Sequence, residues 1–217
     1  MPPFRNLVLP CFLLLLSLAS PAMADEVKPG RYRGAMGPDV AAMLEISRDG
    51  RFEYMLSAGA LDEHGEGRWT RASSGAVVLD SEPHPKAPVF AVDAIEKGRD
   101  ALFTLHVVWP DGQDIAAVDF RIGFSDGNEA TGYTQYDGWS AELDKGAAPA
   151  WIEVSEPFYR TVMPRLDLPP DARTVRIRLT PNDMGTVDFN QVEARMEDGA
   201  LILHRDIGDL RFVPQGK

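Results

Sequence analysis

The chain has 217 residues, with 33 acidic against 22 basic residues and a formal net charge of −11 at pH 7. A protein this acidic is repelled by nucleic-acid backbones and by anionic membrane surfaces, so we expect neither as a partner. Its only cysteine is Cys11, which excludes an internal disulfide framework.

Residues 1–24 have the features of a secretory signal peptide. Arg5 precedes an apolar run over 7–19, and Ala22-Met23-Ala24 forms a small-residue cleavage site, which predicts a mature chain beginning at Asp25. The run is short and broken by Pro10, which disfavours a membrane span; an uncleaved anchor is the alternative. Because Arg5 is the only charged residue before Asp25, residues 25–217 keep 21 basic and 33 acidic residues.

The compartment follows from the same observations. The part after the signal has no cysteine, and the chain has no Asn-x-Ser/Thr sequon. We therefore expect a soluble periplasmic or secreted protein of the bacterial cell envelope, with no transmembrane segment after cleavage of the signal.

The first expected elements after the signal are strands. Alternating runs at 41–47 and 51–57 flank Asp49-Gly50, a dipeptide typical of tight β-hairpins. Strands are predicted next at 67–70, 76–80 and 88–95. The run at 101–109 is apolar on both parities, as in a strand that is covered on both faces.

The C-terminal part continues in the same way. Residues 172–179 alternate, 191–206 read as a second hairpin around Asp198-Gly199, and 209–213 form a last strand. No amphipathic helix of ten residues or more is predicted. Many short strands with Gly, Pro and Asp between them indicate an all-β fold, which we expect to be an antiparallel β-meander or partial barrel followed by a β-sandwich.

Domain boundaries are placed by composition. The stretches 144–151 and 163–172 are rich in Pro and Ala and look like linkers, and a softer break lies near 96–99. We expect an N-terminal β-meander over 25–97 and a C-terminal β-sandwich over 98–217, with one merged domain as the alternative.

Two segments resemble known families. Residues 103–143 contain turns at Asp111-Gly112 and Asp126-Gly127, followed by Thr134, Gly138 and Trp139. This pattern resembles the carboxypeptidase regulatory-like domains, a transthyretin-like β-sandwich family, although the family commonly has Asp where this chain has Gln135. The resemblance implies a non-catalytic module. Residues 30–83 are similar to the repeated hairpins of small lipocalin-like envelope proteins.

Three aromatic residues, Tyr133, Tyr136 and Trp139, are the candidate ligand-binding residues. Tyr133 and Tyr136 have opposite parity in an extended strand, so they would face opposite ways, and Asp137-Gly138 would then redirect Trp139. We therefore favour a packed corner of the sandwich with Trp139 buried. A binding platform for a glycan or peptide is the alternative.

Four residues are candidate metal ligands: His64, His84, Asp183 and Asp188. Imidazole and carboxylate groups can hold a divalent ion. However, no His-x-x-x-His, Cys-x-x-Cys or EF-hand spacing is present, and all four lie in stretches typical of turns. We predict no cofactor.

The expected function is that of a non-catalytic binding or interaction module of the cell envelope. Its partner would be an envelope protein, a glycan or a small apolar ligand. Two alternatives belong to other classes: a lipocalin-like carrier of a small apolar ligand, and a carboxylate-dependent envelope hydrolase. An apolar cavity would favour the carrier, and a cleft with two close acids would favour the enzyme.

Overall fold

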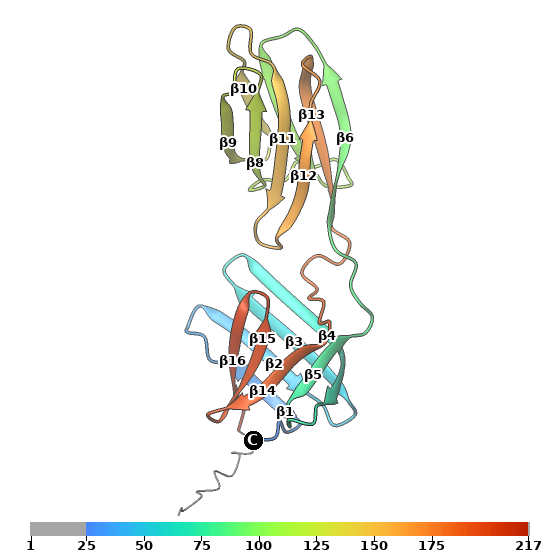
Figure 1. The fold of residues 1–217 in the computed structure, drawn as a ribbon, viewed down its shortest axis with the longest axis vertical. Helices are drawn as coiled ribbons and strands as arrows, with labels where there is room; N and C mark the ends of the chain where they lie inside the picture. Colours follow the sequence, from blue (N-terminus) through green and yellow to red (C-terminus); the bar gives the residue numbers. More distant parts are fainter. Residues whose placement is uncertain (1–24, 217) are drawn as a thin grey trace, which may run out of the picture.

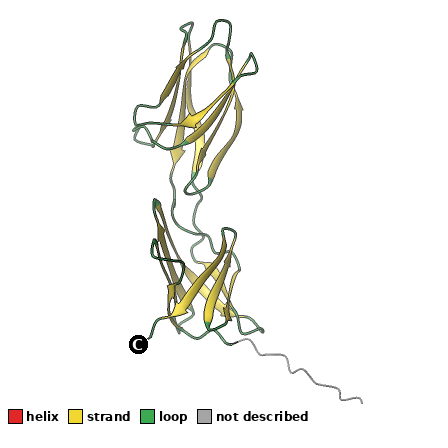
Figure 2. Ribbon diagram, turned by 90° about the vertical axis from the view of Figure 1, so that its left-hand side faces the viewer, coloured by secondary structure: helices red, strands yellow, loops and turns green. Residues whose placement is uncertain are grey.

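The protein was analysed as a computed structural model that describes residues 25–216. The predicted signal peptide over 1–24 lies outside these described residues. Strands and loops make up the whole of the described chain, without a helix (Figure 2), so the all-β prediction is confirmed. None of the described segments is a helix of the length and hydropathy that crossing a membrane requires.

Eight antiparallel strands close a barrel in the lower half of Figure 1. β1 pairs with both β2 and β16, which closes the barrel, and β5 pairs with β14. Each strand thus lies beside its neighbour in the chain, apart from the β5–β14 pair and the closing β1–β16 pair. The barrel strands are β1 (Gly30–Gly34), β2 (Val40–Ile46), β3 (Arg51–Ala58), β4 (Leu61–Arg71), β5 (Val77–Ser81), β14 (Val192–Glu197), β15 (Ala200–Arg205) and β16 (Gly208–Pro214).

A β-sandwich is inserted between β5 and β14 and forms the upper half of Figure 1. Its sheets have the orders β10-β7-β13-β6 and β12-β11-β8-β9, and only β7 and β13 run parallel among the registered pairs. The strands are β6 (Val89–Lys97), β7 (Leu102–Val108), β8 (Asp119–Phe124), β9 (Glu129–Tyr133), β10 (Trp139–Glu142), β11 (Pro149–Glu156), β12 (Thr161–Asp167) and β13 (Ala172–Thr180).

The expected division into residues 25–97 and 98–217 is therefore wrong. β6, which was expected in the N-terminal unit, pairs with β13 in the sandwich, and β14 to β16 belong to the barrel. The stretches 144–151 and 163–172 are not linkers between domains, because β11 begins at Pro149 and β12 ends at Asp167. The barrel and the sandwich are instead connected by residues 82–88 and 181–191.

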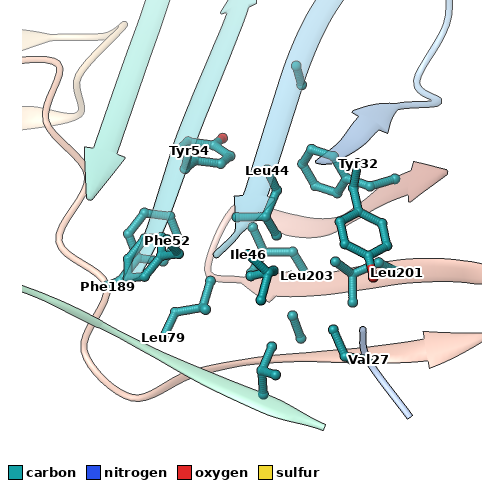
Figure 3. Packing of buried hydrophobic residues seen from close by; sticks show 14 of the residues in the cluster. Val27, Tyr32, Leu44, Ile46, Phe52, Tyr54, Leu79, Phe189, Leu201 and Leu203 are labelled. Carbon is teal, nitrogen blue, oxygen red and sulfur yellow. The ribbon is translucent and has the colours of Figure 1, made fainter. Parts of the chain in front are cut away.

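The barrel interior is filled by side chains from alternate strand positions (Figure 3). Phe189, from the second connection, is fully buried there and contacts Phe52 and Tyr54 edge-on, with ring centroids 5.0 and 5.2 Å apart. Gly65 makes the room, since a Cβ at that position would lie 2.6 Å from the Phe189 ring. The second connection is thus anchored in the barrel core.

Candidate functional site: the cleft between barrel and sandwich

The two connections run beside each other as a hydrogen-bonded pair, which we call the linker ribbon (residues 82–88 and 181–188). The Asp183 amide donates to the Lys86 carbonyl (3.1 Å), and the Lys86 amide donates to Asp183 Oδ2 (2.8 Å). The Asn182 side-chain amide donates to the Ala87 carbonyl (2.7 Å). The ribbon therefore has its own internal structure.

The barrel holds the ribbon through β4. The His64 amide donates to the Gly185 carbonyl (2.9 Å), and the Val187 amide donates to the His64 carbonyl (2.7 Å). Next along the chain, the buried Ser81 hydroxyl accepts the Phe189 amide (2.9 Å). Together with the buried Phe189 ring, these bonds fix the ribbon to the edge of the barrel.

A cleft of about 510 Å³ opens between the ribbon, the barrel and the sandwich; we call it the interunit cleft. The sandwich contributes the β11–β12 turn, which carries Phe158, and the barrel contributes the β15–β16 turn, which carries Ile207. These side chains are 45% and 42% exposed. The turn around Phe158 is held by Glu156, whose carboxylate accepts the amides of Phe158 (3.3 Å) and Tyr159 (2.7 Å).

A buried ion pair forms one wall of the cleft. Arg205 donates to both carboxylate oxygens of Glu63, at 2.5 and 3.3 Å, and to the Tyr54 hydroxyl at 2.8 Å, while that hydroxyl donates to Glu63 Oε2 at 3.0 Å. The side chains of Arg205 and Glu63 are only 8% and 12% exposed. Both Glu63 oxygens are thus occupied by donors of the protein itself.

The protonation states follow from this geometry. Burial raises the pKa of the Tyr54 hydroxyl above its ordinary value of 10.0, so it stays protonated and can donate. Burial alone would lower the pKa of Arg205, but the hydrogen bonds and charges of Glu63 and Tyr54 outweigh it and raise that pKa. This wall of the cleft therefore consists of the charged pair of Arg205 and Glu63 and the neutral hydroxyl of Tyr54.

A second, exposed ion pair bridges the two units across the cleft. Arg160, at the end of the sandwich turn, donates to Asp206 of the barrel turn at 2.9 Å. Both side chains are mostly exposed, so this pair contributes little to stability. It connects the β11–β12 turn to the β15–β16 turn.

The four candidate metal ligands all lie at or beside the linker ribbon. His84 Nδ1 is 2.7 Å from Asp188 Oδ1, His64 Nε2 is 3.1 Å from the Thr186 hydroxyl, and Asp183 accepts the Lys86 amide. Within residues 25–216, no group of three or more His, Cys, Asp or Glu side chains gathers in a metal-binding arrangement. The hydrogen bond to Asp188 raises the pKa of His84 above 6.5.

The three candidate aromatic residues differ in how far they are exposed. Tyr133 and Tyr136 are 60% and 85% exposed, whereas Trp139 is partly buried against Phe120, with ring centroids 4.7 Å apart. Gly138 lets the chain approach β7, because a Cβ there would lie 2.5 Å from the Leu105 carbonyl. The stretch is a corner of the sandwich, with Trp139 less buried than expected.

Glu63 and Arg205 were missed as a pair by sequence reasoning. A signal was present, because each is a charged residue at an inward-facing position of its strand: Glu63 has the parity of Gly65, and Arg205 that of Leu203. Two inward charges of opposite sign indicate a buried pair.

The chain was compared with protein-family models, with curated proteins and with solved structures, and none of them matches it.

Proposed function

We propose that the chain is an exported, non-catalytic binding module of the bacterial cell envelope, and that it holds a polypeptide segment of a partner protein in the interunit cleft. The observation that carries this proposal is the cleft's construction. Phe158 and Ile207, each more than two-fifths exposed, line one cleft from opposite units. Exposed apolar side chains that line a concavity between two units are typical of binding sites.

The charges of the cleft support binding rather than acid–base chemistry. Glu63 accepts from Arg205 and Tyr54, Asp183 accepts the Lys86 amide, and Asp188 is bonded to His84. A general base needs a free lone pair within reach of the proton that it removes. Both oxygens of Glu63 are engaged in holding the wall of the cleft, which makes a hydrolase that relies on this buried carboxylate the weaker candidate.

The packing of the barrel argues against an interior carrier. The rings of Phe52, Phe189 and Phe212 are fully buried among aliphatic side chains in the barrel. A small barrel can either be filled by its own side chains or hold a ligand. Because these rings occupy the interior, a partner is better accommodated outside the barrel, in the cleft.

The resemblance of residues 103–143 to carboxypeptidase regulatory-like domains agrees with this proposal, since that family is non-catalytic. Those residues span β7 to β10 of the sandwich. The signal-like sequence before Asp25 supports a periplasmic or secreted location, where the partner would be an envelope protein.

Site-specific photo-crosslinking tests the proposal. A photoreactive amino acid at Ile207 in the full chain, produced in its native host, should give a discrete adduct with one envelope protein. The control position is Val213, which is 37% exposed on β16 and outside the cleft lining. The adduct should disappear in the Phe158→Ser background, whose melting temperature should stay near that of the wild type because Phe158 is half exposed. Equal labelling from both positions, or an adduct that survives Phe158→Ser, would contradict the proposal.

A further inference from the structure

The sandwich has four edge strands, and three of them carry features that obstruct pairing with another strand. β12 contains Pro164 and lies against β6, and the ladders of both strands have a register shift. β10 has only four residues. Proline, irregular ladders and short length are the usual means by which natural sheets protect their edges.

β9, with the sequence Glu-Ala-Thr-Gly-Tyr, has neither a proline nor an irregular ladder, and it is one residue longer than β10. It is five residues long, contains no proline, and pairs with β8 without a register shift. It is the last strand of its sheet, so one side of its backbone has no partner strand. A regular, open edge is a template for another strand.

The hydrogen bonds at the two ends of the β8–β9 ladder show which backbone amides and carbonyls of β9 point toward β8 and which point toward the open edge. The Phe124 amide donates to the Asn128 carbonyl, and the Thr134 amide donates to the Val118 carbonyl. Because hydrogen-bonded pairs alternate along an antiparallel ladder, Ala130 and Gly132 bond to β8. The amides and carbonyls of Glu129, Thr131 and Tyr133 therefore point away from β8, at the open edge.

We propose that two copies of this chain associate through their β9 edges, antiparallel, about a twofold axis at Thr131. Thr131 then faces Thr131 of the second copy, and Glu129 faces Tyr133 in both directions. All three outward-pointing residues of each strand are paired in this one register, because they are placed symmetrically about the central residue. The β12-β11-β8-β9 sheets of the two copies would then form one continuous sheet.

The side chains are compatible with this register. A Thr–Thr pair across strands is favourable, and no like charges face each other. Glu129 is already held by Arg121, whose guanidinium donates to it at 2.9 Å, and Tyr133 is 60% exposed and free to cover its new neighbour. A five-residue edge buries much less than a standard interface, so the association is weak. Both copies are acidic, so added salt strengthens it by screening their repulsion.

Cysteine crosslinking tests the register directly, because residues 25–217 contain no cysteine. In Thr131→Cys the two Cα atoms would lie about 5.5 Å apart, within disulfide range. In the control Asn128→Cys, six residue steps separate the two positions, about 20 Å. Under mild oxidation the Thr131→Cys protein should form disulfide dimers about tenfold faster than the Asn128→Cys protein. Equal rates would overturn the proposal.

A second pair of variants tests the backbone contacts in sedimentation experiments at about 1 mM protein. Thr131→Pro removes an outward amide that makes no bond to β8, so this variant should sediment as a monomer while its melting temperature changes little. Thr131→Val keeps the amide and should still associate. Wild-type protein that stays monomeric, or Thr131→Pro protein that associates as wild type does, would overturn the proposal, whatever binds in the interunit cleft.

Discussion

Replacing Arg205 by Met tests whether the wall of the interunit cleft is a buried ion pair. Methionine keeps most of the apolar length of arginine but removes all of its donors. Both oxygens of Glu63, which is only 12% exposed, would then lose Arg205 and keep only the Tyr54 hydroxyl on Oε2. The substitution also removes the guanidinium that lies 5.4 Å from the centre of the Tyr54 ring.

The expected loss is large. Breaking a buried pair by removing one partner costs about 3–5 kcal/mol, because a buried charge is left uncompensated. The free energy of unfolding of a domain is about 5–15 kcal/mol, so the barrel should unfold at a clearly lower denaturant concentration. Adding Glu63→Gln removes the stranded charge while keeping an acceptor for Tyr54. The double variant should therefore be more stable than Arg205→Met alone.

Urea unfolding of the wild type, both single variants and the double variant measures these differences, and gives the coupling between the two positions as a double-mutant cycle. Unfolding should be followed by a probe of the barrel, since the two units can unfold separately. The argument fails if Arg205→Met costs less than about 1 kcal/mol, or if the two substitutions are additive.

Further expectations concern the ribbon and the sandwich corner. Phe189→Ala should lower the free energy of unfolding of the barrel by about 3–5 kcal/mol, and Phe189→Leu by about 1 kcal/mol, in the same urea experiment. Trp139→Ala should cost about 2–3 kcal/mol because Trp139 is only partly buried, whereas Tyr136→Ala, 85% exposed, should change the melting temperature little. An NMR titration should place the pKa of His84 above 6.5 in the wild type. In the Asp188→Asn variant, the pKa of His84 should be closer to 6.5, because the hydrogen bond to the carboxylate is lost. Because the folded-state pKa is raised, the pair stabilises the fold below about pH 6.5, and this contribution is lost as pH rises through the pKa of His84.

Local pairing could be predicted from the sequence because its signals are local. Asp49-Gly50 and Asp198-Gly199 sit between alternating runs, and both hairpins form, as β2–β3 and β14–β15. A type of turn that suits the twist of two strands is encoded in two residues. The sheet to which a hairpin belongs is not encoded in this way, so the C-terminal hairpin was assigned to the wrong unit.

Linkers were misplaced for a related reason. Pro and Ala were read as breaks at 144–151 and 163–172, but Pro149 begins a strand and Pro164 lies in an edge strand, where a missing amide is tolerated. The true first connection, 82–88, contains three prolines and was interpreted only as an exposed turn. A proline-rich composition marks both edge strands and segments without a strand, and does not distinguish these two cases.

Part of the candidate site could be predicted from the sequence. His64, His84, Asp183 and Asp188 were singled out by residue type, and they do lie in one region. Their proximity depends on two connections separated by about a hundred residues, which the β6–β13 pair of the sandwich and the closure of the barrel at β5–β14 bring together.

The closure of the barrel also determines the order in which the two units of the protein can fold. Asp80 and Gln191 are 111 residues apart and hydrogen-bonded, so the barrel cannot close until almost the whole chain has been synthesised. The sandwich strands, in contrast, are complete once residue 180 is available. A sandwich that folds first draws residues 82 and 181 together and reduces the entropy lost when β14 meets β5. We therefore expect the sandwich to guide the folding of the barrel that surrounds it in the sequence.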